Sequence, residues 1–479
     1  MKLPERNQWS KNFSEWFHRV IFEVPIYDTR YPVKGTGIWM PYGFKIRQKV
    51  IEIIREELVK RGHEEVLFPT LIPDYMIRKE SEHIRSFEDQ VFWITHAGDS
   101  LLDVKLALRP TSETSIYPMF QLWIKSYSDL PLKIFQIVNV FRYETKATKP
   151  MIRVREISTF KEAHTAHATK EDAEKQVKEG IEIYKAFFEK LGIPYVISIR
   201  PSWDKFPGAE YSIAFDTIMP DGRTLQIGTV HFLGQNFAKA FDIKYMRADG
   251  KYEYVWQTCY GISERVIAAL ISIHGDDHGL ILPSMIAPIQ VVIIPIIYKG
   301  KEDVLNICKE IKEILEKSSL RVYLDDEKEE TPGSKYFKWE LRGVPIRIEI
   351  GPRDIENKTV VLVRRDNLQK ITISRDKIIE EIRKLLEEVD MSLKERAKKW
   401  LNEHILREYK LEKVKEILSE KGGIIEIPWC GRDTCGQDIE NKVDVRVLGV
   451  PYELNEKPSG SCANCNLPAN NWIRVARSY

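Results

Sequence analysis

The amino-acid sequence predicts an α/β (α+β) fold divided among several domains, and three observations carry this prediction. The chain has 479 residues, which is more than one hydrophobic core usually organises, because domains typically hold roughly 100–200 residues. A hairpin of two long strands in the first half indicates an antiparallel sheet, whereas strands alternating with helices after residue 285 indicate a separate α/β domain with parallel pairing. Four of the six cysteines gather near the end of the chain. We therefore expect domains at residues 1–285, 286–390 and 391–479.

The composition is that of an ordinary globular protein, with 43% hydrophobic and 30% charged residues. The amino terminus lacks the apolar run of a signal peptide, and prolines interrupt the longest apolar stretch, Met285–Tyr298. We therefore expect a cytoplasmic protein that is neither secreted nor membrane-spanning. Lys and Arg total 73 against 71 for Asp and Glu, so any RNA binding must come from local patches.

The first strong helical pattern runs from Phe44 to Arg61, where apolar residues recur with the helical period and Gly62 supplies a stop. A strand should follow over residues 66–72. Pro69 within it removes a ladder hydrogen bond, which places that strand at a sheet edge or an interface.

The predicted hairpin consists of a strand over residues 131–144, a polar loop, and a return strand over residues 151–156. Side chains alternate faces in a strand, so one surface of this hairpin can carry three arginines and one carboxylate. In isolation this would be a solvated face with cross-strand ion pairs. The four side chains are Arg142, Glu144, Arg153 and Arg155.

A second segment with unusual charge placement begins at Gly261, which ends an extended run. Ser263 is a plausible cap for the helix that follows, and this puts Arg265 in the first helical turn. A cation there opposes the helix dipole by roughly 0.3–1 kcal/mol. The placement makes sense if an anion occupies that end of the helix.

The second domain is expected from regular alternation of strands and helices, closed by helical residues Arg375–Val389. A charged helix around Leu393–Glu420 should lead to the cysteine-bearing end. The expected elements are a strand Gln290–Ile297, a helix Lys301–Lys317, a strand Arg321–Leu324, a helix after Ser334 and a strand Pro345–Ile350.

Three segments resemble, in the required order, the motifs of class II aminoacyl-tRNA synthetases. Residues 62–69 resemble motif 1, residues 141–144 motif 2 and residues 261–265 motif 3. Neither a GxxxxGK[ST] loop nor a GxGxxG loop is present, so the arginine-bearing surface is left to bind the nucleotide. The resemblance implies an antiparallel-sheet catalytic domain, an α/β anticodon-binding domain and a C-terminal α/β zinc-binding domain.

Within this class the chain resembles the prolyl enzymes of archaeal and eukaryotic type. Residues 109–114 look like the amino-acid recognition loop of the prolyl, threonyl and seryl group, and residues 203–210 and 225–237 resemble the prolyl members. The terminal cysteines and Tyr479 fit the same type, whose C-terminus folds back towards the catalytic domain. The family implies activation of L-proline with ATP to prolyl-adenylate, transfer to the 3′ end of tRNA(Pro), and a homodimer formed through motif 1.

The resemblance also assigns site residues, in which planar and permanently charged arginine forks suit two anionic reactants. Catalysis is assigned to Arg142 and Arg265. Proline binding is assigned to Thr111, Glu113, Arg142, Trp203, Phe206 and His231. ATP binding is assigned to Arg142, Glu144, Arg153, Phe160, Gln226, Thr229, Ser263 and Arg265, with Mg²⁺ joining the phosphates near Gln226. Anticodon contacts are assigned to Glu340, Arg347, Arg353 and Asp354.

The cysteine pattern predicts a metal site. Two close pairs give four thiolates, enough for a tetrahedral structural Zn²⁺ with no open position, whereas the alternative is four reduced thiols. Cys259 is interpreted as a small packed residue that lines the pocket. The expected zinc ligands are Cys430, Cys435, Cys462 and Cys465.

Two other functions remain open at this point. A threonyl-type enzyme of the same class would typically carry a catalytic-site Cys/His zinc set. A catalytically inactive synthetase-like regulatory protein is the other alternative, against which the intact Arg142, Glu144 and Arg265 argue. Only 92 residues separate His164 from Gln257, so the large editing insertion of bacterial-type prolyl enzymes is not expected here.

Overall fold

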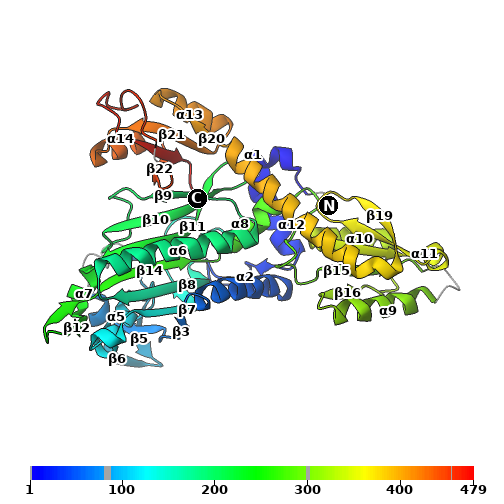
Figure 1. Ribbon diagram of the computed structural model, residues 1–479, viewed down its shortest axis with the longest axis horizontal. Helices are drawn as coiled ribbons and strands as arrows, with labels where there is room; N and C mark the ends of the chain where they lie inside the picture. Colours follow the sequence, from blue (N-terminus) through cyan, green and yellow to red (C-terminus); the bar gives the residue numbers. More distant parts are fainter. Residues whose placement is uncertain (1–2, 80–87, 298–302, 455) are drawn as a thin grey trace.

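The computed structural model describes residues 3–79, 88–297, 303–454 and 456–479, which form three lobes around a long helix (Figure 1). The catalytic lobe contains most of an 11-stranded sheet, and the other two lobes lie at either end of α12 (Ile378–Glu403). None of the helices in the described ranges is long and apolar enough to cross a membrane.

The catalytic part of the sheet is antiparallel, as the sequence predicts. Its strand order is β9-β10-β11-β14-β8-β7, and every neighbouring pair in this run is antiparallel. Short β3 (Glu64–Glu65), which lies within the predicted motif 1, pairs in parallel with β7 at the edge. The strands are β7 (Leu132–Phe141), β8 (Glu156–His167), β9 (Val196–Ile199), β10 (Tyr211–Ile218), β11 (Thr224–Gly234) and β14 (Trp256–Ile262).

One face of this sheet is covered by α6 (Lys170–Leu191). The helix begins at Thr169, whose hydroxyl accepts from the Asp172 N–H, and ends at Gly192, which has φ 65°. Gly180 lets the helix approach closely, since a Cβ there would lie 3.3 Å from Val230. Three more helices pack nearby: α1 (Trp9–Glu23), α2 (Pro41–Val59) and α8 (Arg265–His274). The active-site cavity lies on the other face of the sheet.

Three local expectations need correction. The hairpin returns later than predicted, because β8 starts at Glu156 and residues 142–155 form a loop. Arg153 and Arg155 therefore do not share a strand face, and the Arg155 guanidinium lies 3.9 Å from the centre of the Tyr143 ring instead. Of the expected strand over 66–72, only Leu71 and Ile72 lie in a strand, β4 (Leu71–Pro73), whereas β3 ends before it at Glu65. Glu264, not Ser263, holds the N-cap position of α8 without a side-chain capping bond, although the Ser263 hydroxyl accepts from the Arg265 N–H at 3.4 Å.

Smaller elements surround the sheet. A three-stranded sheet has the order β4-β6-β5, and two hairpins pair β1 with β2 and β12 with β13. Their bounds are β1 (Tyr27–Asp28), β2 (Ile38–Trp39), α3 (Asp74–Ile77), β5 (Trp93–Ala97), β6 (Ser100–Leu108), α5 (Glu113–Trp123), α7 (Asn236–Phe241), β12 (Lys244–Met246) and β13 (Tyr252–Tyr254).

The second domain has the expected alternation and two additional strands. Strands β16, β15 and β17 are parallel, whereas β18 and β19 add an antiparallel edge, so the sheet is mixed. Its elements are β15 (Val291–Pro295), α9 (Asp303–Lys317), β16 (Val322–Leu324), α10 (Pro332–Leu341), β17 (Ile346–Ile350), α11 (Pro352–Asn357), β18 (Thr359–Arg364) and β19 (Lys370–Ser374).

The C-terminal domain extends the catalytic sheet, because β22 pairs with β9 through Val450 and Ile199. Helix α12 continues through residue 390 without a break. As predicted, the chain end folds back on the catalytic domain: the Tyr479 hydroxyl donates to Asp221 at 2.6 Å. The elements are β20 (Ile405–Arg407), α13 (Leu411–Glu420), β21 (Ile424–Trp429), α14 (Asp433–Val443), β22 (Arg446–Pro451) and β23 (Asn471–Ala476).

Candidate active site

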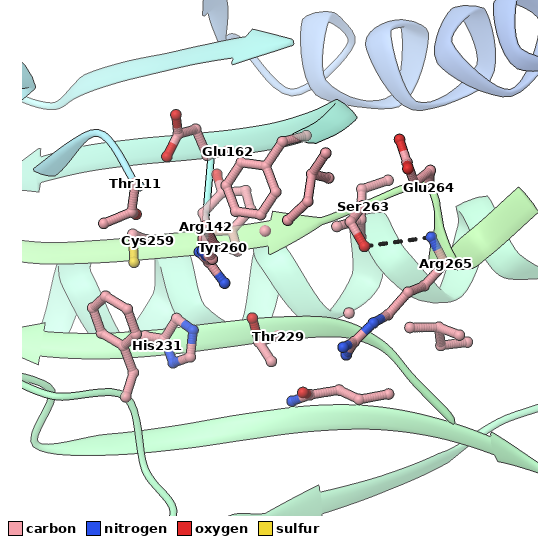
Figure 2. Close-up of a pocket in the computed structure, with 18 of the residues that line it drawn as sticks. Thr111, Arg142, Glu162, Thr229, His231, Cys259, Tyr260, Ser263, Glu264 and Arg265 are labelled. Carbon is pink, nitrogen blue, oxygen red and sulfur yellow. Dashed lines mark hydrogen bonds between the residues drawn. The ribbon is translucent and has the colours of Figure 1, made fainter. Parts of the chain in front are cut away.

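A cavity of about 380 Å³ opens on the sheet face opposite α6 (Figure 2). Strand alternation explains its lining: Thr229 and His231 of β11 reach the cavity, whereas Val230 between them packs under α6. Strands β8 and β14, the loop after β7 and residues 204–207 complete the walls.

The cavity gathers nearly all of the side chains that the sequence assigned to proline and ATP. These residues come from segments more than a hundred positions apart, so only the fold brings them together. The predicted residues that line the cavity are Thr111, Glu113, Arg142, Glu144, Arg153, Phe160, Phe206, Gln226, Thr229, His231, Ser263 and Arg265.

Trp203 is the exception, because it does not line the cavity and contacts the C-terminal domain instead. Its indole N–H donates to Glu440 at 3.2 Å, and its ring lies 6.4 Å from that of Trp429 in the C-terminal domain. A Cβ on Gly436 would come within 2.2 Å of the indole, so the two domains fit closely there. Burial of the large ring between domains holds it away from the cavity.

One end of the cavity combines a buried carboxylate with an aromatic slot. Glu113 is the first residue of α5, and the Thr111 hydroxyl donates to its Oε2 at 2.5 Å. The rings of Phe206 and His231 stack with centroids 4.6 Å apart. Burial lowers the pKa of His231 to about 3, so this imidazole is neutral at pH 7. The arrangement suits a compact organic ammonium with an apolar ring.

The other end of the cavity carries an excess of positive charge. Burial, together with the neighbouring charges of Arg142 and Arg153, lowers the pKa of Arg265 to about 10, so it remains a cation at neutral pH. Arg142 is held by the Pro110 carbonyl, which accepts from its Nε at 2.9 Å, and it lies 5.5 Å from the Phe160 ring. An anion at this end would relieve the mutual repulsion of the arginines.

The charged or titratable lining residues that were missed include two buried carboxylates and one buried histidine. Glu162 is buried and accepts from Gln136 at 2.8 Å, and His164 lies two residues further along β8. Both share the face of Phe160, so the period of two in this strand could have revealed them. Glu264 accepts from the backbone and hydroxyl of Ser158, and burial raises its pKa to about 7.

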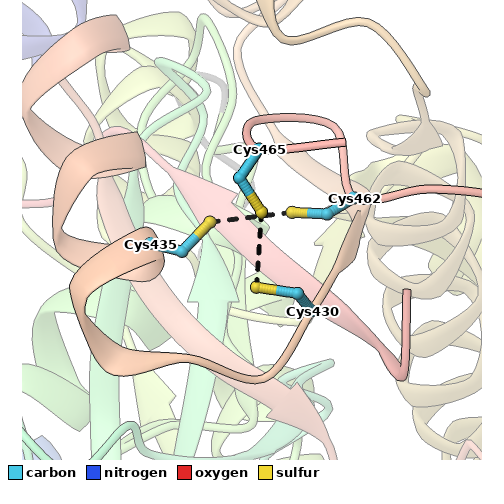
Figure 3. A group of neighbouring side chains, drawn as sticks. All are labelled: Cys430, Cys435, Cys462 and Cys465. Carbon is cyan, nitrogen blue, oxygen red and sulfur yellow. Dashed lines mark hydrogen bonds between the residues drawn. The ribbon is translucent and has the colours of Figure 1, made fainter. Parts of the chain in front are cut away.

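The four clustered cysteines converge as expected (Figure 3). Their sulfur atoms all lie within 4.8 Å of one another, and the Cys435–Cys462 and Cys430–Cys465 pairs are 3.6 Å apart. Tetrahedral zinc with Zn–S bonds of about 2.3 Å needs sulfur atoms about 3.8 Å apart. A disulfide would need about 2.05 Å. The donor set therefore fits Zn²⁺.

Three of the four residues assigned to the anticodon make contacts within their own domain. Arg347 pairs with Glu340 at 2.6 Å and with Glu349 at 3.0 Å, so two of them satisfy each other. Asp354 accepts from the Gly351 N–H at 2.9 Å and thereby stabilises the start of α11.

The antiparallel sheet, its arginine-lined cavity and the attached α/β domain define a class II aminoacyl-tRNA synthetase. Family models match in three places: "tRNA synthetase class II core domain (G, H, P, S and T)" at residues 92–274, "Anticodon binding domain" at 290–385 and "Prolyl-tRNA synthetase, C-terminal" at 411–479. The chain belongs to the prolyl-tRNA synthetases, the proline–tRNA ligases, as full-length relatives show.

Those relatives are similar over essentially their whole length. Proline–tRNA ligases of Sulfurisphaera tokodaii and Metallosphaera sedula are 56% and 57% identical, with 99% and 100% of both chains covered. A solved structure of Giardia lamblia prolyl-tRNA synthetase in complex with prolyl-adenylate has a TM-score of 0.95 at 38% identity, covering 100% of this chain and 99% of that one. The family predicted from the motifs is thus confirmed over the threonyl-type alternative.

Proposed function

We propose that this cavity performs both steps of proline–tRNA ligation, with the residue roles given below. The observation that carries the proposal is the juxtaposition of the Glu113 carboxylate and its aromatic slot with the guanidinium groups of Arg142 and Arg265 in one cavity. The first half suits an amino acid and the second half suits a triphosphate.

Proline enters the carboxylate end. Its secondary ammonium has two N–H donors, for which Glu113 and Thr111 offer acceptors, and its ring packs against the stacked side chains of Phe206 and His231. Neutral His231 adds no charge that would repel the ammonium. Prolyl-adenylate bound to the Giardia lamblia protein supports a proline site of this kind in the family.

ATP occupies the arginine end. The proline carboxylate attacks the α-phosphate and pyrophosphate leaves, a step that rests on positioning and charge neutralisation. Arg142 bridges the carboxylate and the α-phosphate, while Arg153 and Arg265 hold the outer phosphates. Residues assigned to the adenosine and the metal side are Glu144 on the adenine amino group, Phe160 stacked on the ring, Ser263 and Thr229 as polar contacts, and Gln226 beside Mg²⁺.

Transfer follows when the terminal ribose hydroxyl of tRNA(Pro) attacks the adenylate carbonyl and AMP leaves. We assign the anticodon to the domain at residues 286–390, with contacts from the set Glu340, Arg347, Arg353 and Asp354. The domain at 391–479 holds one structural Zn²⁺ through its four cysteines. A homodimer forms through residues 62–69 of the catalytic domain, 1–285, and we expect the enzyme in the cytoplasm.

Amino-acid-dependent pyrophosphate exchange tests the substrate. We expect proline to support incorporation of labelled pyrophosphate into ATP more than about 100-fold better than threonine, because threonine lacks the ring that the aromatic slot contacts. A preference for threonine would contradict the proline assignment. If no amino acid supports exchange, the protein is a synthetase-like protein without catalysis.

A further inference from the structure

Three buried side chains that differ in chemistry meet at the floor of the proline end of the cavity. Glu113 comes from α5, His164 from β8 and Cys259 from β14, and each is at most 5% exposed. One ligand atom from each lies within 4.8 Å of the other two. Figure 2 shows the Cys259 sulfur directed into the cavity, with Thr111 on one side and His231 on the other.

The distance between the Cys259 sulfur and the nearer Glu113 oxygen is close to the distance between two ligand atoms of a zinc site. The Cys259 sulfur lies 3.9 Å from Glu113 Oε1. Tetrahedral zinc with Zn–S of about 2.3 Å and Zn–O of about 2.1 Å would place these atoms about 3.6 Å apart. A shift of a few tenths of an ångström would therefore bring both atoms into the coordination sphere.

His164 is already oriented by an outer partner. Its Nδ1 lies 3.0 Å from the hydroxyl of Tyr117, which is fully buried. Metal-binding imidazoles are usually fixed in this way by a hydrogen bond at the second ring nitrogen. The other nitrogen, Nε2, lies 3.4 Å from Glu162 Oε2, on the carboxylate-lined side of the cavity.

Charge also favours a cation at this floor. Glu113 and Glu162 are both buried there, at 2% and 3% exposure, and both line the cavity. Burial and the Glu113 charge raise the pKa of the Cys259 thiol well above its usual range, so the free pocket holds a neutral thiol. A metal ion would displace that proton to solvent and pair with the resulting thiolate.

We propose that the proline pocket also binds one soft divalent cation, such as Zn²⁺, through Glu113, His164 and Cys259, and that this ion competes with proline. Three protein ligands leave the fourth position of a tetrahedral ion open to water. The metal takes the Glu113 carboxylate that the prolyl ammonium needs, so the two ligands exclude each other. The competition rests on the proposed function, whereas the binding does not.

The binding is tested on the full-length protein with its C-terminal zinc in place, without proline or ATP. Free Zn²⁺ is set with a metal buffer, and bound zinc is counted by native mass spectrometry. We expect one zinc per chain beyond the first for the wild type and for Cys308→Ala, a buried cysteine of α9. We expect none beyond the first for Cys259→Ala. A second zinc that persists in Cys259→Ala, or none in the wild type, overturns the proposal.

The competition is tested by proline-dependent exchange at several free zinc concentrations. At roughly ten times the dissociation constant of the metal, the apparent KM for proline should rise about tenfold while kcat is retained. Inhibition that excess proline does not relieve overturns the proposal, while zinc-free exchange still reports the proline activity itself. If Cys259→Ala does not fold, Co²⁺ added to the wild type serves instead: its thiolate charge-transfer band should appear and then vanish with a prolyl-adenylate analogue. A band that survives the analogue counts against the site.

Discussion

Arg365 of the second domain forms a bidentate ion pair with Asp276, with N–O distances of 2.6 and 2.8 Å. Asp276 lies two residues beyond the end of α8, the helix whose first residue is Arg265. Arg365 also donates to the Glu340 carbonyl at 2.7 Å, and Glu340 pairs with Arg347. A chain of contacts therefore joins the proposed anticodon side to the helix that presents a cavity arginine.

Substitution Asp276→Asn tests whether this pair couples the two domains. The Arg365 side chain is only 1% exposed, and an unpaired buried charge costs about 3–5 kcal/mol when its partner is removed. We expect a lower unfolding temperature, and tRNA charging that falls about tenfold while proline-dependent exchange is retained. Asp249→Asn, which breaks a half-exposed pair with Arg247, is the matched control and should change neither.

The same pair predicts a pH dependence. Burial raises the pKa of Asp276, but hydrogen bonding and charge from Arg365 outweigh it, so the net pKa lies below the usual 3.8. A lowered folded-state pKa means that the contribution to stability is present above about pH 4 and is lost as the pH falls through the folded value. Acid titration of the unfolding free energy should show this loss in the wild type and less of it in Asp276→Asn. The same loss of unfolding free energy in both proteins would contradict the assignment of this pH dependence to Asp276.

Arg142→Lys should abolish adenylate formation and leave the fold intact. A lysine is a point charge and cannot span a carboxylate and a phosphate as the planar fork does. We expect proline-dependent exchange to fall by at least about 100-fold, with an unchanged circular dichroism spectrum. Arg155→Lys is the control, because that arginine stacks on Tyr143 in the same loop and does not line the cavity. Near-normal exchange in Arg142→Lys would contradict the proposal that Arg142 bridges the carboxylate and the α-phosphate.

The cysteine cluster should hold one zinc per chain, in a structural role. Cys462 is 1% exposed and belongs to the core of the C-terminal domain, so loss of the metal should lower the unfolding temperature. Metal analysis of protein purified without chelator should give one zinc per chain fewer for Cys462→Ser than for the wild type. Cys308→Ser, in another domain, should retain the metal. A metal-free wild type, or an unchanged content in Cys462→Ser, would refute the site.

Leu67 should lie in a dimer interface. It belongs to the predicted motif 1 segment and is 80% exposed in the single chain, an unusual place for a large apolar side chain. Leu67→Glu should shift the mass in solution from twice 56.0 kDa towards 56.0 kDa, because a charge would be buried against apolar atoms. Met391→Glu, on α12 and 58% exposed, should leave the mass unchanged. A fully active wild-type monomer at micromolar concentration would contradict the interface.

The sequence predicted best what local patterning decides. Apolar alternation identified β7, and helical periodicity identified α2 within three residues at either end. It failed where distant contacts decide the conformation. The Arg155 N–H donates to the Gly35 carbonyl at 2.7 Å, a contact 120 residues away that holds the loop out of the strand. The position of Trp203 outside the cavity was missed for the same reason, since it depends on a domain that docks from more than 200 residues further along the chain.

Whether this chain can hydrolyse tRNA that carries alanine depends on which elements the segment between β8 and β14 forms. Residues 170–254 form α6, β9, β10, β11, α7, β12 and β13, and all of this interval is described. Strands β9, β10 and β11 belong to the central sheet, and α6 covers it. The interval therefore contains no separate domain that could hydrolyse a misacylated tRNA.

Alanine should be activated measurably and its ester left intact. Alanine is smaller than proline, so the aromatic wall formed by Phe206 and His231 cannot exclude it sterically, and discrimination rests on lost ring contacts worth about 1–3 kcal/mol for each methylene-sized difference. Exchange with alanine should therefore be detectable, and Phe206→Ala should narrow the gap between the two substrates by weakening proline more than alanine. Pre-formed alanyl-tRNA(Pro) incubated with the purified enzyme should lose its ester at the uncatalysed rate. Deacylation well above that rate, abolished by boiling the protein, would reveal a hydrolytic site elsewhere in the chain.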